Sequence, residues 1–282
     1  MPASNVPLSD AMDLNLRSVV EDLNREKSVI TVAIWDLGAR VGRLPQLIYQ
    51  MNEVQSSFTF FSIQAAIPAG PLTRSTNAAD WVRQYSGRLG KSELNEIASN
   101  VFASSFFKQA QPVRKQLGVD YLVGVSPSLV AVEEDDALYW NYFSTSSGRL
   151  MLASSYDLRR YARAAERSFE VAVAIVVLGQ FIATLNPRSE FHEDRGCLFD
   201  FNGNRDSVVE VIRTPQIEPV CLKLIKEKYR AAAAALMELL RNYSPEGELE
   251  ESSQKQTTDV ADDKYWLDKL TELSQESEEE IA

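Results

Sequence analysis

Apolar and polar residues alternate along the chain in two ways, and the two patterns predict different elements. Runs of β-branched and aromatic residues bounded by charged residues, glycine or proline predict buried strands. Three such runs occupy residues 28–37, 57–67 and 119–126, and two shorter ones occupy residues 138–144 and 150–154. Apolar residues spaced three and four apart predict helices. These cover residues 13–27, 45–55 and 92–117, whereas residues 73–91 and 127–137 show neither pattern and are predicted to be irregular.

The last third of the domain is helical by the same criteria. Residues 156–185 predict one long helix or two abutting ones, which Pro187 ends. The second half of this segment is apolar on all sides, which predicts a helix buried on every side. Two further helices are predicted over residues 204–213 and 217–242.

Strands that alternate with helices early in the chain and helices that follow one another later indicate an α+β fold. We therefore predict a mixed sheet with packed helices and a helical C-terminal part. Residues 13–243 are taken as one domain, after a flexible N-terminus over residues 1–12.

Charge separates the domain from its tail. The chain carries a formal net charge of −11, and most of it lies after Tyr243, where thirteen Asp or Glu residues face three Lys. Residues 244–263 are polar without an apolar period and predict a disordered acidic linker. The nearly neutral domain and the acidic tail argue against a nucleic-acid partner.

The N-terminus has neither a basic segment nor an apolar stretch, so no secretory signal is expected. The longest apolar run is about half of the ~20 residues that cross a membrane. Two cysteines cannot build a disulfide framework. We expect a soluble, cytoplasmic protein that does not associate with membranes.

Candidate chemistry gathers just after the apolar helix. The only histidine of the chain, His192, and one of its two cysteines, Cys197, lie in a polar turn, and the other cysteine, Cys221, follows 24 positions later. Because a catalytic zinc motif of the HExxH type needs two histidines on one helix, the sequence excludes it.

The order of these segments resembles the archaemetzincin-like branch of the zincin metallopeptidases. Residues 119–126 resemble the first strand signature of that family, residues 152–159 its Ser-x-x-Arg-Leu-like turn, and residues 169–185 stand in the place of its active-site helix. Residues 197–199 resemble its Cys-x-Met motif. Residues 218–221 resemble its Cys-x-x-Cys motif, with Glu218 in the place of the first cysteine.

The sequence departs from this family where the catalysis would occur. Residues 176–180 read Val-Val-Leu-Gly-Gln, and apolar side chains neither bind a metal nor polarise water. The resemblance therefore implies a degenerate zincin, a non-catalytic pseudo-peptidase whose role is protein binding or assembly rather than enzymatic. No cofactor is required by this interpretation.

Three interpretations of the cysteines and the histidine stay open at this point. The first is a structural zinc site with ligands His192, Cys197 and Cys221, and Asp200 or Glu218 as a fourth ligand. The second is a hydrolase in which His192 activates Cys197 and Asp200 or Asp194 orients the imidazole. The plainest, which the sequence favours, has small buried cysteines, a histidine on a surface turn, and Asp200 capping the helix that follows.

The end of the tail holds a candidate partner-binding segment. Tyr265, Trp266, Leu270 and Leu273 lie within residues 264–282, the last three at helical spacing. Such a segment is typical of a short motif that folds as an amphipathic helix in the groove of a protein partner. We therefore expect the acidic tail to act as a docking element.

Overall fold

A computed structural model describes residues 29–63, 78–186 and 191–245. The chain divides into two units, Met1–Tyr243 and Ser244–Ala282, and the description below concerns the first. The predicted helix over residues 13–27 and the predicted docking helix over residues 264–282, with the acidic linker before it, lie outside the described residues.

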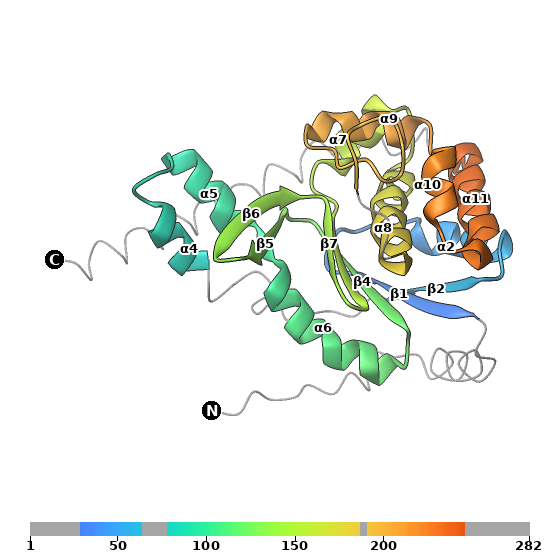
Figure 1. The fold of residues 1–282 in the computed structure, drawn as a ribbon, viewed down its shortest axis with the longest axis horizontal. Coiled ribbons are helices and arrows are strands. Elements are labelled where there is room, and N and C mark those ends of the chain that lie inside the picture. Colours follow the sequence, from blue (N-terminus) through green and yellow to red (C-terminus); the bar gives the residue numbers. More distant parts are fainter. Residues whose placement is uncertain (1–28, 64–77, 187–190, 246–282) are drawn as a thin grey trace. The chain divides into compact units, whose positions relative to one another are not determined.

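A five-stranded mixed sheet forms the centre of the first unit (Figure 1). Its strands follow the order β2-β1-β4-β8-β7. The bounds are β1 Ile30–Asp36, β2 Phe58–Ile63, β4 Tyr121–Ser126, β7 Ser144–Ser147 and β8 Leu150–Ser154. Three of the four neighbouring pairs are parallel, and the fourth, β7 with β8 at the edge of the sheet, is antiparallel.

Helices cover both faces of this sheet because its strands carry apolar residues on both. In β1, Val32 and Ile34 belong to one apolar core, and Ala33 and Trp35 belong to another on the opposite face. The first core is closed by α2 Leu44–Glu53, α8 Phe169–Leu185 and α11 Glu227–Asn242. The second is closed by α6 Ala103–Leu117.

A second sheet of three strands, in the order β3-β5-β6, carries its own small core. Its strands are β3 Val101–Phe102, β5 Val130–Glu134 and β6 Ala137–Tyr142. Two helices, α4 Ala78–Tyr85 and α5 Lys91–Ser99, contribute the aromatic and apolar residues that pack against it.

This second sheet is where the predicted elements are wrong. Residues 127–137 were expected to be irregular, but they contain β5, and the two aspartates Asp135 and Asp136 form its hairpin turn at φ 49° and 60°. Residues 73–91 contain α4, because Tyr85 packs against Trp140 of β6 and Trp81 packs beside Tyr85 on the same small core.

The single helix expected over residues 92–117 is interrupted before α6 begins. Val101 pairs with Val130 of β5, so the chain becomes extended there, and α5 and α6 are separate helices. Pro112 lies inside α6, and Gly118 ends that helix at φ 71° as expected from the sequence.

The C-terminal part is helical, as predicted. The segment expected as one long helix or two abutting ones is α7 Leu158–Ala164 followed by α8, with a bend of 112° between them. The remaining helices are a short 3₁₀ turn Arg205–Ser207, α9 Val208–Arg213, α10 Pro219–Leu224 and α11. The expected helix over residues 217–242 is thus split between α10 and α11, where Ile225 is extended. The α+β class is confirmed.

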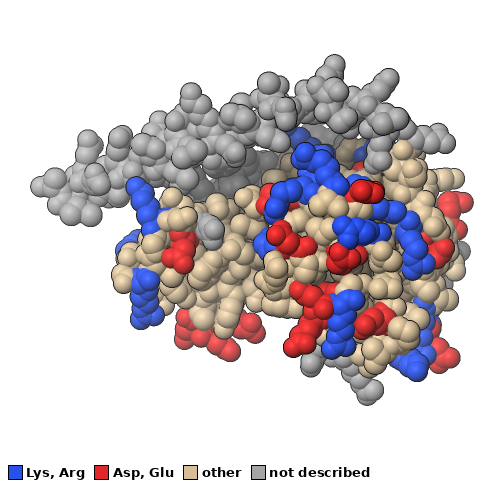
Figure 2. All heavy atoms as spheres, turned by 90° about the horizontal axis from the view of Figure 1, so that it is seen from above, with Lys and Arg blue, Asp and Glu red and all other residues tan. Residues whose placement is uncertain are grey.

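Among the described residues, no single helix has both the length and the apolarity to cross a membrane; α7 and α8 together pass that test only as a sharply bent pair. Basic and acidic side chains are interspersed on the face of the molecule seen in Figure 2, without a continuous basic surface on that face.

Candidate metal centre

Four side chains bring one potential ligand atom each to a single point between the loop after α8 and the start of α10. The ligand atoms of His192, Cys197, Glu218 and Cys221 all lie within 4.8 Å of one another. His192 Nε2 is 3.2 Å from Cys221 Sγ and 3.8 Å from Glu218 Oε2, which is 4.0 Å from the same sulfur. Donor atoms of a tetrahedral zinc site are about 3.3–3.8 Å apart, as zinc bonds of about 2.0–2.3 Å require. The separations of 3.2–4.0 Å are close to this spacing, and the widest separation, within 4.8 Å, would shorten when the four atoms bind one zinc ion.

Two segments supply these ligands. His192 and Cys197 belong to residues 191–204, which we call the metal loop. Glu218 is the N-cap of α10 and Cys221 lies three residues further along it, so both side chains share one face of the first turn. The backbone N–H of Leu198 donates to the Gln216 carbonyl at 2.8 Å, which ties the loop to the segment before α10.

Cys197 is fixed in the interior. Its side chain is fully buried, and its sulfur accepts the backbone N–H of Glu218 at 3.4 Å. The loop lies directly on α8 at this point: a Cβ atom at Gly179 would be 3.1 Å from the Leu198 carbonyl oxygen. A glycine in α8 thus allows the close approach that places Cys197.

Asp200 shapes the turn between the two loop ligands. Its carboxylate is buried, and Oδ2 accepts the backbone N–H groups of Arg195, Gly196 and Cys197 at 2.7, 2.6 and 3.0 Å. Three charge-assisted hydrogen bonds to one oxygen fold these residues around it. The turn directs the Cys197 side chain inward.

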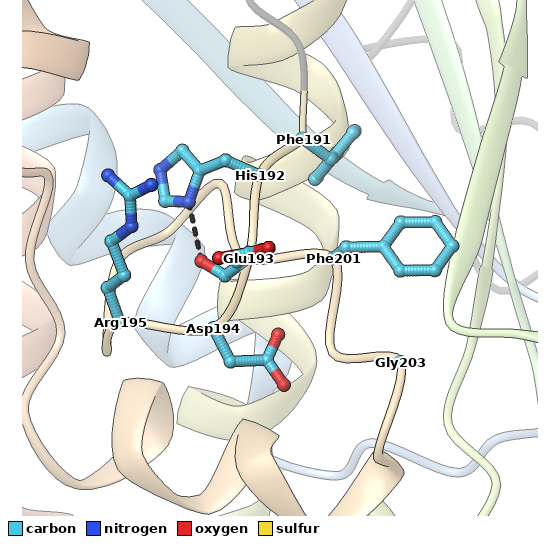
Figure 3. A pocket seen from close by; sticks show the side chains of 7 residues that line it. All are labelled: Phe191, His192, Glu193, Asp194, Arg195, Phe201 and Gly203. Carbon is cyan, nitrogen blue, oxygen red and sulfur yellow. Dashed lines mark hydrogen bonds between the residues drawn. The ribbon is translucent and has the colours of Figure 1, made fainter.

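The other oxygen of Asp200 orients the histidine. Oδ1 lies 3.3 Å from His192 Nδ1, which is also 2.8 Å from the Glu193 carbonyl oxygen (Figure 3). Two oxygens beside Nδ1 favour the tautomer that has its proton there, and in this tautomer the lone pair of Nε2 faces Cys221. A carboxylate behind a histidine that presents its other nitrogen is the arrangement found at protein metal sites.

The electrostatic surroundings keep the Cys221 thiol protonated in the metal-free protein. The pKa of Cys221 is raised from 9.0 to about 12, chiefly by burial and also by the neighbouring Cys197 and Glu218, against an opposing effect of Arg195. Arg195 lies with Nη1 3.8 Å from Glu218 Oε2 at the exposed side of the cluster. A thiol of this kind becomes a ligand when a metal replaces its proton.

The structure brings together the three ligands considered from the sequence, His192, Cys197 and Cys221. Of the two candidates for a fourth ligand, Glu218 joins them, and Asp200 stands behind His192 instead. Asp200 is not the cap expected for the following helix, because Asn204 accepts the N–H of Asp206 there at 3.2 Å. The Glu-x-x-Cys spacing of Glu218 and Cys221 was the signal for this pair.

The expected pairing of His192 with Cys197 as base and nucleophile is not formed. His192 Nε2 faces Cys221 instead, and Cys197 is closed off from solvent. Asp200 does lie behind the imidazole, as that interpretation required. The partner-binding residues Tyr265, Trp266, Leu270 and Leu273 lie outside the described part of the chain.

Helix α8, for which the sequence resemblance implied the place of an active-site helix, is packed as core. Residues 171–179 are all buried and apolar or glycine, as its all-round apolarity predicted. Gln180 is buried too, and its side-chain amide is 3.0 Å from the hydroxyl groups of both Ser144 and Ser146. These contacts with β7 satisfy the hydrogen-bonding groups of the Gln180 side chain, so its role is structural.

Comparisons with known proteins return matches at the level of structure alone. No protein-family model matches the chain, and no curated protein matches it. Among solved structures, an archaemetzincin from Archaeoglobus fulgidus, crystallised with malonate, is 9% identical with a TM-score of 0.43. A zinc-dependent peptidase from Methanocorpusculum labreanum is 10% identical with a TM-score of 0.37. Each match covers 70% of this chain and all of the other. The first of these two names is that of the family that the sequence resembles.

Proposed function

We propose that this protein holds one zinc ion in a closed structural site made by His192, Cys197, Glu218 and Cys221, and that it acts by binding another protein. The observation that carries the proposal is the convergence of these four ligand atoms within 4.8 Å. Two sulfurs, an imidazole nitrogen and a carboxylate oxygen form a set that suits Zn²⁺.

The donor set favours a structural over a catalytic role. A catalytic zinc site keeps one position open for water or substrate, whereas four protein ligands close it. Bound zinc would join the metal loop to α10, and the free energy of binding would stabilise that part of the fold.

The absence of a second histidine supports a non-catalytic protein. The only histidine of the chain belongs to this cluster, so an HExxH motif cannot exist elsewhere. The acidic tail is proposed to act as a docking element for the protein partner, with Trp266 and Leu270 as its central contacts. Trp266→Ala together with Leu270→Ala should then abolish the recovery of a cross-linked partner without changing the zinc content.

The first test is the metal content of the full-length protein after dialysis, measured by plasma mass spectrometry. We expect one zinc per chain in the wild type, and loss of zinc in Cys221→Ser and His192→Ala. Glu218→Gln should weaken zinc binding, whereas Glu210→Gln, an exposed glutamate of α9, is the matched control that should not. A wild-type protein that binds no zinc would refute the site.

Catalysis is tested on the same zinc-loaded sample with denatured casein. No cleavage is expected. Cleavage that a chelator abolishes and that disappears in His192→Ala would contradict the non-catalytic role.

A second candidate function follows from one specific contact. Cys221 Sγ, His192 and Asp200 lie in a row, at 3.2 and 3.3 Å, in the order of a nucleophile, a base and an orienting acid. The raised pKa of Cys221 and its burial oppose this role, because a catalytic cysteine needs an accessible thiolate. Rapid alkylation of Cys221 by iodoacetamide at neutral pH in metal-free protein would favour this candidate, and slow alkylation is expected.

A further inference from the structure

The outer side of the metal loop is hollowed. A cavity of about 730 Å³ opens there, lined by Phe191, His192, Glu193, Asp194, Arg195, Phe201 and Gly203 (Figure 3). The side chains of Phe191 and Phe201 lie on one side of the loop, and those of His192 and Arg195 on the other. We call this cavity the docking hollow. It shares His192 with the proposed zinc site, so one loop forms both.

Two phenyl rings are held out toward solvent at this hollow. Phe191 is 37% exposed and Phe201 is 56% exposed, and both stand among the larger apolar side chains on the surface of the described chain. Each ring makes a T-shaped contact with a neighbouring ring: Phe201 meets Tyr142 at 6.2 Å, and Phe191 meets the buried Phe199 at 6.4 Å. The remaining exposed surface of both rings can contact a ligand.

Two carboxylates accompany the rings. Glu193 and Asp194 are both exposed, and within the described part of the chain neither is in an ion pair. Asp194 is held in place because its Oδ1 accepts the N–H of Asn202 at 2.7 Å. The basic residue of the lining, Arg195, is turned to Glu218. The aromatic side of the hollow is thus negatively charged.

We propose that the docking hollow binds an arginine side chain of a protein partner. A guanidinium group is planar, stacks on aromatic rings and pairs with carboxylates through two N–H groups, so it fits rings and carboxylates that stand together. Lysine presents a compact, strongly hydrated charge and fits the ring faces less well. The inference rests on the proposed protein-binding function and names the chemistry of its partner.

The test is an amide NMR titration of the zinc-loaded full chain with N-acetyl-Gly-Arg-Gly-amide. Saturable shifts are expected for the amides of residues 191–204. The same tripeptide with Lys in the central position should bind more weakly. The tripeptide with Gln in that position should not bind measurably. Higher ionic strength should weaken the binding of the Arg peptide, because salt screens the exposed carboxylates.

Single substitutions should have moderate effects that add together. Phe201→Ala should weaken binding about two- to five-fold, as expected for one exposed contact between a cation and a ring. Glu193→Gln should weaken it by up to about five-fold, as for an exposed ion pair. The controls are Tyr49→Ala, an exposed ring on α2, and Glu210→Gln, which should leave binding unchanged.

The outcomes separate this inference from the zinc site, provided that zinc content is measured in every sample. Three results in zinc-loaded protein would overturn the docking hollow alone. The first is equal shifts with the Gln and Arg peptides, and the second is equal or tighter binding of the Lys peptide. The third is binding of the Arg peptide that survives the combined Phe201→Ala and Glu193→Gln change. Arg-selective binding that depends on Phe201 in a protein without zinc would support the hollow and refute the zinc site.

Discussion

Asp200→Asn tests the part of the site that lies behind the ligands. Asp200 accepts three backbone N–H groups with one oxygen and faces His192 Nδ1 with the other. Asparagine keeps one acceptor and replaces the other with an NH₂ donor. In one orientation the new NH₂ faces the three N–H groups of the turn, and in the other it faces the N–H of His192, which keeps the Glu193 carbonyl as an acceptor. In both orientations the buried NH₂ group meets another donor instead of an acceptor, which costs about 1–3 kcal/mol.

The effect on zinc follows from the orientation of His192. Loss of a group that orients a metal ligand weakens metal binding by about 10–100-fold, equivalent to about 1.4–2.7 kcal/mol. The assay is competition for zinc with a chromophoric chelator. Asp206→Asn is the matched control, because Asp206 is exposed and its ion pair with Arg160 lies on the surface. An unchanged zinc affinity in Asp200→Asn, or an equal loss in Asp206→Asn, would refute the reasoning.

Four further predictions concern the pH dependence of the site and the packing of the domain. Because the pKa of the Cys221 thiol is raised to about 12, zinc must displace the thiol proton at neutral pH. The apparent zinc affinity should therefore rise by about tenfold or more per pH unit. Isothermal titration at several pH values would measure this rise. Because the pKa of Cys221 in the folded protein lies above its unfolded value of 9.0, the contribution of its neutral thiol to the stability of the metal-free fold is fully present below pH 9.0 and is lost as the pH rises toward 12, which urea unfolding across that window would detect. Gly124→Ala should destabilise the domain by about 1–3 kcal/mol, because the new Cβ would lie 2.5 Å from the buried Phe106 ring; an unchanged urea midpoint would contradict this packing. Arg167→Ala should lower the thermal midpoint by removing a guanidinium that donates to the carbonyls of Leu240, Arg241 and Tyr243 at the end of α11, and Arg163→Ala on the exposed face of α7 should not.

The sequence was most informative where an element is buried by its own pattern. Strands β1 and β4 and helix α8 consist of apolar residues bounded by polar ones, so their existence follows from local composition. The second sheet was missed because its elements depend on distant partners. Residues Val101 and Phe102 become a strand only because β5 lies beside them, and α4 is stabilised by contacts with β6.

The candidate site shows the same division. The residue types that could bind a metal were visible in His192, Cys197 and Cys221, but their convergence depends on the approach of the metal loop to α8 and α10. That approach is set by the close contact of Gly179 with Leu198 and by the hydrogen bond between Leu198 and Gln216, each of which joins two segments that are distant from one another in sequence. Spacing alone did not decide the role of Asp200. A carboxylate in such a loop can bind a metal, cap a helix or orient a histidine.

X-ray absorption at the zinc edge of the purified full chain tests the central claim most directly. The four proposed ligands predict two sulfur neighbours at about 2.3 Å and two nitrogen or oxygen neighbours at about 2.0–2.2 Å. In Cys221→Ser any remaining zinc should have fewer sulfur neighbours. Zinc surrounded by nitrogen and oxygen alone, or a wild-type protein that retains no zinc, would contradict a site built from His192, Cys197, Glu218 and Cys221.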